Sequence, residues 1–177
     1  MQEEFVYVML KPDTLETGMR QVVLDELLAV GGEPVCSKRL ILRLDQIMEI
    51  YSDFNNERAK RAVFHYFTHR ETEHFVFAGL PGIHLKYQNA KGKTGTGVGI
   101  KGRHYTRYTR LSAEELNAWF EGTLLNTEVI DLEMFGRDIL HIPNSPPESI
   151  RSILSVFSSS EIEVLERQYA CSFAACV

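Results

Sequence analysis

The feature that most constrains the fold is a junction between a strand and a helix, in the segment RDILHIPNSPPES at residues 137–149. The extended apolar run of this segment ends on His141, and a helix start follows within a few residues. Ser145 is a preferred N-cap residue, prolines are tolerated in the first turn, and Glu148 completes the Ser-x-x-Glu pattern of a capping box. The segment therefore predicts a strand that ends on a histidine and turns at once into a helix.

Strand and helix signals alternate along the rest of the chain. Runs rich in β-forming residues at 4–12, 33–44 and 73–80 predict three more strands, and the fourth lies at 137–143. Apolar residues at helical spacing predict helices after each strand, with a long glycine-rich loop at 92–102. This order predicts an α+β, ferredoxin-like fold with a four-stranded antiparallel sheet and helices packed on it.

The composition is that of an ordinary globular protein. The 177 residues are 44% hydrophobic and 24% charged, and no apolar run approaches the length of a membrane span. The N-terminal MQEEFVYV has no long apolar region of the kind that a secretory signal needs. Three cysteines without metal-site spacing are typical of reduced thiols, and we expect a cytoplasmic protein without a bound metal of its own.

The charge is distributed unevenly. Seven of the 19 Lys and Arg residues lie between Ile83 and Ser112, a stretch without Asp or Glu, and the net charge of the whole chain is −5. An acidic body with one basic segment indicates a local anion site, although a solvated basic loop would show the same pattern.

Four segments resemble nucleoside diphosphate kinases. FVYVMLKPDTLETGMRQVVLDELLAVGGEPVCSKRLI resembles the opening of that family, with a strand ending in Lys-Pro-Asp, a glycine before a long helix and a second strand. MEIYSDF resembles the tyrosine-bearing helix that follows, and GRDILHIPNSPPES resembles the strand that carries the phosphorylated histidine. FSSSEIEVLERQYA is similar to the C-terminal extension of longer members. The resemblance covers roughly residues 4–80 and 133–170, while 83–125 does not align.

The resemblance implies a phosphotransferase that moves the terminal phosphoryl group of a nucleoside triphosphate to a nucleoside diphosphate through a phosphohistidine. His141 would be the nucleophile, which suits an imidazole that is neutral near pH 7. Lys11 would supply positive charge, and Tyr51 would orient the imidazole or contact phosphate and ribose. Asp138 and Asn144 stand where the family has polar residues. Mg²⁺ would enter with ATP or another triphosphate, and the family's assembly implies a homo-oligomer.

The resemblance also implies one domain over residues 1–177, with a basic glycine-rich insertion around 86–111 and a C-terminal extension at 158–177.

Several family residues are replaced. The family's His-Gly-Ser-Asp reads HIPN at 141–144, and the helical glutamate that fixes the histidine falls at Arg151-Ser152-Ile153. The base-stacking aromatic falls near Ala59, and a phosphate-binding arginine has become Leu125.

Arginines of the basic segment could compensate for the lost one. Arg103, Arg107 and Arg110 are the candidates, and we expect Arg107 and Arg110, which share one face if helical, to bind phosphate.

Two alternatives stay open. The chain could be a nucleotide-binding or regulatory module with the same fold and little or no kinase activity. The basic segment, with Tyr87, Tyr105 and Tyr108 among its cations, could also bind single-stranded nucleic acid, which we rank below a nucleotide. GKT at 92–94 lacks the upstream glycine of a phosphate loop, and GVGIKG at 97–102 follows no strand, so neither predicts a dinucleotide or P-loop fold.

Overall fold

The computed structural model describes residues 3–53, 57–93, 97–104 and 139–173 of the chain. The elements in chain order are β1 (Glu4–Leu10), α1 (Pro12–Glu16), α2 (Arg20–Ala29), β2 (Glu33–Ile41), α3 (Leu44–Ile50), α4 (Glu57–Phe67), β3 (Glu71–Gly79), α5 (Ile83–Lys91), α6 (Gly99–His104), β4 (Leu140–His141), α8 (Pro146–Val156) and α9 (Ser159–Tyr169).

The four strands form one sheet in the order β2-β3-β1-β4, and all three neighbouring pairs are antiparallel. This confirms the predicted ferredoxin-like sheet. β1 and β2 run parallel to each other without being neighbours, and so do β3 and β4, because each pair is separated by one antiparallel strand. Met9 in β1 pairs with His74 on one side and with His141 on the other. The histidine strand therefore lies at one edge of the sheet, beside β1.

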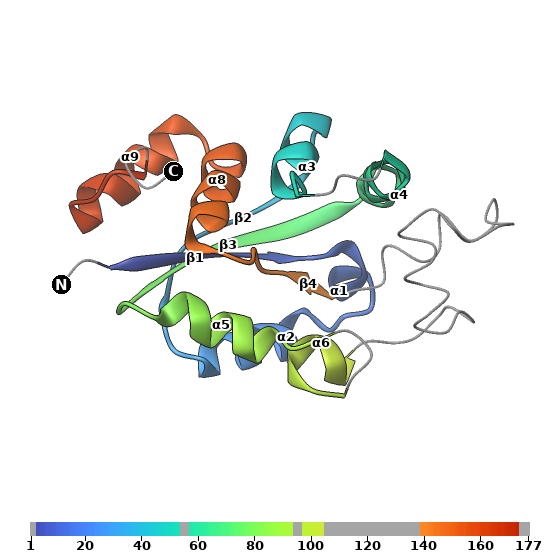
Figure 1. Ribbon diagram of the computed structural model, residues 1–177, viewed down its shortest axis with the longest axis horizontal. Coiled ribbons are helices and arrows are strands. Elements are labelled where there is room, and N and C mark those ends of the chain that lie inside the picture. Colours follow the sequence, from blue (N-terminus) through green and yellow to red (C-terminus); the bar gives the residue numbers. More distant parts are fainter. Residues whose placement is uncertain (1–2, 54–56, 94–96, 105–138, 174–177) are drawn as a thin grey trace, which may run out of the picture.

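Helices cover both faces of the sheet (Figure 1). Successive side chains of a strand point to opposite faces, and β1 is buried on both. Phe5, Tyr7 and Met9 belong to a core cluster with residues of α3, α4, α8 and α9. The intervening Val6, Val8 and Leu10 belong to a second cluster with α2, α5 and α6. β1 thus lies at the centre of two cores, which explains its nearly continuous apolar sequence.

The structure contains two short helices that the sequence does not predict. α1 begins directly after β1, because Lys11 is an extended N-cap residue and Pro12 at the first helical position has a φ angle suited to a helix. α6 begins inside the glycine-rich segment that the sequence indicated as a loop. Gly92 and Gly99 cross there so closely that a Cβ added at Gly99 would lie 2.5 Å from the Gly92 Cα. This backbone contact places α6 beside the end of α5.

The C-terminal helix α9 contributes to the core. Ile162 and Leu165 of α9, and Phe173 after it, are buried in the cluster that contains Phe5. The Phe5 ring lies edge-on to Phe173 and Tyr169, with centroid separations of 4.9 and 5.4 Å. The segment that the resemblance implied to be an extension therefore packs on the sheet.

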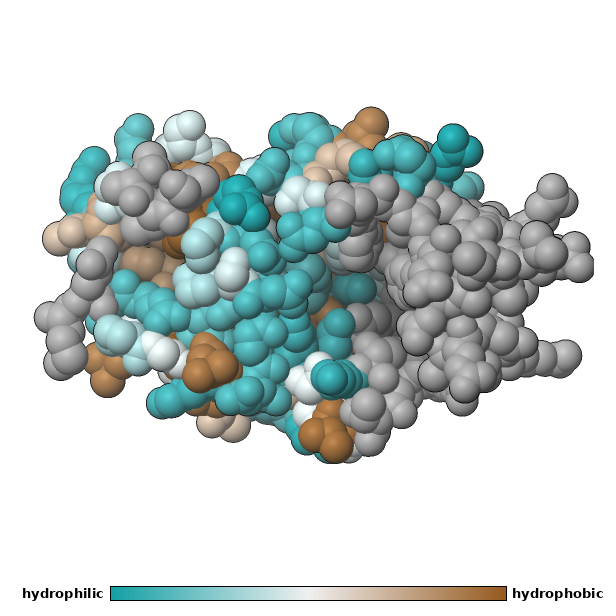
Figure 2. Space-filling model, in the orientation of Figure 1, coloured by the Kyte–Doolittle hydropathy of each residue, from teal (hydrophilic) through white to brown (hydrophobic). Residues whose placement is uncertain are grey.

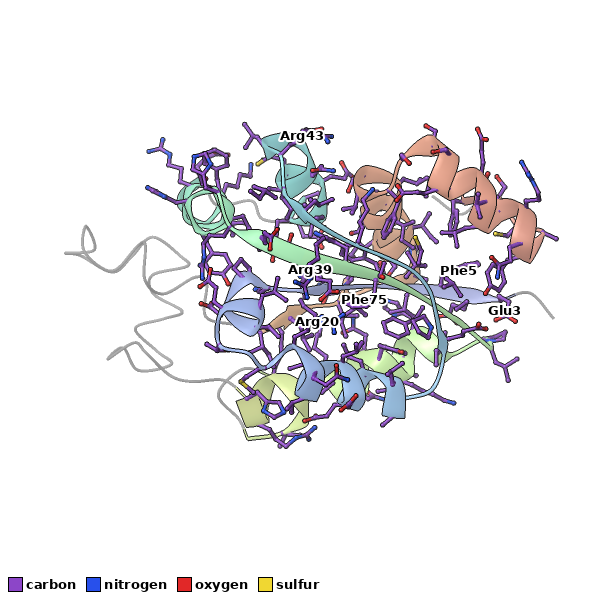
Figure 3. All side chains as sticks on the ribbon, turned by 180° about the vertical axis from the view of Figure 1, so that it is seen from behind. Glu3, Phe5, Arg20, Arg39, Arg43 and Phe75 are labelled. Atoms are coloured by element: carbon purple, nitrogen blue, oxygen red, sulfur yellow. The ribbon has the colours of Figure 1, made fainter. Side chains whose placement is uncertain are left out.

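A buried carboxylate connects three elements. Glu73 of β3 accepts hydrogen bonds from Arg20 of α2 at 2.6 and 2.7 Å and from Arg39 of β2 at 3.5 Å. Figure 3 shows Arg20 and Arg39 side by side. Burial favours a raised pKa for Glu73, but the bonds and charges of the two arginines outweigh it, so the pKa is lowered. The carboxylate therefore stays ionised.

The surface seen in Figure 2 is mostly hydrophilic, with isolated hydrophobic residues. Among the described residues, no helix combines the length and apolar composition that a bilayer span requires.

Candidate active site at the β1 and β4 edge

Lys11 lies at the point where β1 ends and α1 begins. Its side chain is buried, with 5% relative exposure, which is rare for lysine. Its backbone N–H donates to the carbonyl of Ile139 at 3.0 Å, and the Thr14 hydroxyl donates to the same oxygen. The start of α1 is therefore joined to the backbone two residues before His141.

Tyr51 bridges Lys11 and His141. It ends helix α3, and its ring centroid lies 4.9 Å from that of the His141 imidazole. The Lys11 Nζ lies 5.9 Å from the Tyr51 ring centroid, within the range of a cation–π contact. Three residues that the sequence singled out, separated by up to 130 positions, thus converge at one site.

The imidazole of His141 is held in its neutral form. Burial lowers its pKa well below the usual 6.5, and the positive charges of Lys11, Lys101 and Lys91 lower it further, with a smaller effect from His74. An uncharged ring keeps the lone pair that a nucleophile needs.

One nitrogen of the His141 ring is enclosed by its surroundings. Nε2 is buried and has no hydrogen-bond partner among the described residues, whereas the residue as a whole is only half-buried. Arg151, in the turn of α8 where the family's glutamate falls, has its Nε 3.7 Å from a Glu49 carboxylate oxygen in α3. The guanidinium group of Arg151 therefore lies next to Glu49 of α3.

Asn144, three residues after the histidine, is exposed. Its backbone N–H donates to Glu148 at 2.9 Å, and its side-chain oxygen lies 3.4 Å from the Lys91 Nζ. Glu148 thus reaches an amide one residue before the N-cap, while its own N–H contacts the Ser145 hydroxyl at 3.4 Å. The predicted helix start at Ser145 is confirmed.

The predicted Arg107, Arg110 and Asp138 lie outside the described residues. Arg103 is described, and it pairs with Glu26 of α2.

Sequence reasoning missed Lys91 and Lys101. Both lie in the basic segment, but the sequence analysis considered only the arginines there, as replacements for the family's phosphate-binding arginine. One feature of the sequence relates Lys91 to this site: it lies three positions after Gln88, so the two side chains share one face of a helix.

Comparison with known proteins gives a likeness in fold. No family model matches the chain, and neither does any curated protein sequence. Among solved structures, a nucleoside-diphosphate kinase from Borrelia burgdorferi, a transition-state mimic with bound vanadate and ADP, has a TM-score of 0.67 and 16% identity, covering 91% of this chain and 90% of that one.

Two further structures agree with it. The nucleoside diphosphate kinase of Aquifex aeolicus has a TM-score of 0.64 at 16% identity, covering 90% of this chain and 98% of that one. The NDP kinase of Pyrobaculum aerophilum has a TM-score of 0.63 at 17% identity, with the same coverage. At these identities the likeness establishes the fold, which is that of nucleoside diphosphate kinases in a divergent sequence.

Proposed function

Because this chain has the fold of nucleoside diphosphate kinases, we propose that it is a phosphotransferase acting through a phosphohistidine on His141. It would move the terminal phosphoryl group from a nucleoside triphosphate to a nucleoside diphosphate. The observation that supports this most is the neutral imidazole of His141 beside Tyr51 and the buried ammonium group of Lys11.

The nitrogen that we assign to the attack is Nδ1, because Nε2 is sealed from solvent. The Nδ1 lone pair forms a bond to the γ-phosphorus, and the bond from that phosphorus to the β–γ bridging oxygen breaks. The electron pair leaves with the nucleoside diphosphate. In the second half-reaction, a terminal oxygen of another diphosphate attacks the phosphohistidine and the Nδ1–P bond breaks, which restores the neutral ring.

Positive charge is the main requirement of this reaction, because the transition state spreads negative charge over the phosphoryl oxygens. We assign this role to Lys11 and Lys101, whose charges act on His141. Tyr51 would orient the ring. Mg²⁺ enters as part of the nucleotide substrate and neutralises phosphate charge.

Four further residues stay predictions for phosphate or polar contacts: Arg107, Arg110, Asp138 and Asn144.

The test is covalent labelling. The chain incubated with Mg²⁺ and γ-labelled ATP should acquire label that is lost in acid and kept in base, and ADP should remove it. His141→Asn should abolish the label, while His65→Asn, which changes an exposed histidine, should keep it. An unlabelled wild-type chain would exclude the phosphotransferase.

A nucleotide-binding module without turnover is the second candidate. It is favoured by the Nε2 of His141, which has no orienting acceptor among the described residues. This candidate predicts that ADP raises the melting temperature equally in the wild type and in His141→Asn, with no label in either.

We also propose a homo-oligomer. β2 is an edge strand, and the exposed apolar side chains of Ile41 and Leu44 lie at its end and just beyond it. Light scattering on the purified chain would measure the assembly.

A further inference from the structure

Helix α5 holds the backbone that follows His141, and we propose that Gln88 and Lys91 of this helix are positioning residues for the His141 imidazole. The inference rests on the proposed function, since it concerns how the same nucleophile is kept in place.

Two side chains of α5 donate to consecutive carbonyl oxygens after the histidine. Gln88 Nε2 donates to Ile142 O at 3.3 Å and also to Pro143 O. Lys91 Nζ donates to Ile142 O at 2.9 Å. Gln88 and Lys91 are three positions apart and therefore lie on the same helical face.

The N-terminal end of α5 is hydrogen-bonded to strand β1 of the sheet. The Glu4 carboxylate of β1 accepts hydrogen bonds from the backbone N–H groups of Gly82 at 2.6 Å and His84 at 3.1 Å. These are orphan donors at the start of α5, so the carboxylate caps the helix. Ile83 and Tyr87 pack in the core cluster below the sheet. α5 is thus a fixed support for the donors that it carries.

The loop needs such donors, because strand pairing alone does little to hold it. β4 pairs with β1 over only two residues, Leu140 and His141. Ile142 and Pro143 follow the end of this strand and are buried residues, so their carbonyls need hydrogen-bond partners other than strand pairing. Since buried carbonyls without a partner are costly, the donors of α5 select one path for this backbone.

Loss of one donor should move the histidine without removing any group that touches the nucleotide. A displacement of about 1 Å can cost up to about 10²-fold in rate. We therefore expect a slower phosphoryl transfer with nearly unchanged nucleotide affinity.

The main experiment compares Gln88→Met with Asn89→Met. Both replace an amide on α5 by an apolar side chain, but Asn89 is exposed and donates to neither carbonyl. Single-turnover labelling from γ-labelled ATP should be at least about tenfold slower in Gln88→Met, with the ADP Kd within about twofold of the wild type. Asn89→Met should match the wild type. Equal labelling rates in Gln88→Met and the wild type would overturn the inference, and so would a weakened ADP affinity at unchanged rate.

The second comparison uses the lysines of the same helix. Lys91→Met should slow labelling, and Lys91→Arg, which keeps a donor and the charge, should restore most of the rate. Lys86→Met changes an exposed lysine and is the control. If Lys91→Arg were as slow as Lys91→Met, the positioning role of Lys91 would be excluded.

A measurement independent of catalysis separates this inference from the proposed function. The ¹H–¹³C signal of the His141 ring, assigned by its loss in His141→Asn, should shift or broaden in Gln88→Met and stay unchanged in Asn89→Met. If the wild type forms no phosphohistidine, the proposed function fails, and the ring signal still decides whether α5 positions His141. An unchanged signal in Gln88→Met would contradict the positioning.

Discussion

His141 is only half-buried as a residue, yet its pKa is lowered well below the usual value. Burial is the largest cause of the lowered pKa, and Lys11 is the largest contribution from a charge. A neutral imidazole beside several lysines is consistent with the proposed phosphotransferase, because a bound polyphosphate would offset the mutual repulsion of Lys11, Lys91 and Lys101.

Lys11→Met should therefore raise the pKa of His141 toward its ordinary value, because it removes a neighbouring positive charge. The measurement is an NMR titration of the His141 ring in the absence of nucleotide. Lys86→Met, at an exposed position, should leave the titration unchanged. An unshifted midpoint in Lys11→Met would show that the two groups do not interact.

His74 is the most deeply buried histidine and forms a chain of hydrogen bonds with a fixed direction. The Thr72 hydroxyl donates to the Leu40 carbonyl at 3.0 Å, so its oxygen accepts from His74 Nε2 at 2.7 Å. His74 Nδ1 must then accept from the Tyr7 hydroxyl at 2.7 Å. Burial lowers the pKa of His74 to about 3, so the ring is neutral in the fold.

This buried ring predicts acid sensitivity. The unfolded chain takes up a proton at His74 near pH 6.5, whereas the folded chain takes it up only near pH 3. The contribution of the neutral His74 to the free energy of unfolding is therefore complete above pH 6.5 and is lost as the pH falls toward 3. Between pH 7.5 and pH 5 the loss from this group should be about 2 kcal/mol. Urea unfolding gives the free energy of unfolding at pH 7.5 and at pH 5. The difference between these two values should be smaller in His74→Gln than in the wild type by about 2 kcal/mol.

The exposed His65 provides the control, since His65→Gln should keep the full pH dependence of the wild type. An identical pH dependence in His74→Gln and the wild type would contradict the assignment.

At the scale of elements, the crossing of Gly92 and Gly99 allows a direct test. Gly97 and Gly99 both have a φ angle of +72°, but a Cβ at Gly97 would meet nothing within 4 Å. Gly97→Ala should therefore cost only the strain of the left-handed backbone, about 1–2 kcal/mol. Gly99→Ala adds a clash with the Gly92 backbone. We expect it to be clearly less stable than Gly97→Ala in urea unfolding, and equal stabilities would contradict the crossing.

The strands and long helices could be predicted because their local signals agree with the tertiary structure. β1 is a run of β-forming residues, and α8 has both its serine cap and its apolar spacing in the sequence. α6 could not be predicted in this way, because GIKGRH has two glycines in six residues and a poor intrinsic tendency to form a helix. Its position depends on a backbone contact with the end of α5.

The residues of the site also differ in how far the sequence could predict them. Lys11, Tyr51 and His141 each adjoin the end of a strand or helix with a recognisable pattern, and the structure brings them together. Lys91 acts on a backbone 51 residues away, and no local pattern indicates a contact of that kind. Arg107 and Arg110 stay predictions.

At the scale of the whole molecule, the C-terminal segment covers part of one face of the sheet, and the stability of the fold depends on this cover. A chain truncated after Ser158 would lose Ile162, Leu165 and Phe173 from the core and would uncover Phe5. Each buried side chain of this kind contributes about 1.5–3 kcal/mol, so the truncated chain should be severely destabilised. Circular dichroism melts of the two chains would measure it, and a cooperative transition at the wild-type temperature would show that α9 is dispensable.

The oxygen of Ile139 has a dynamic consequence. It accepts hydrogen bonds from the N–H of Lys11 and from the hydroxyl of Thr14, so the residue that carries the ammonium group is joined to the backbone two residues before the imidazole. Fluctuations that open the helical layers would then leave the spacing of these two groups intact. The amide of Lys11 should exchange its hydrogen with solvent only in the rare events that dismantle the whole sheet.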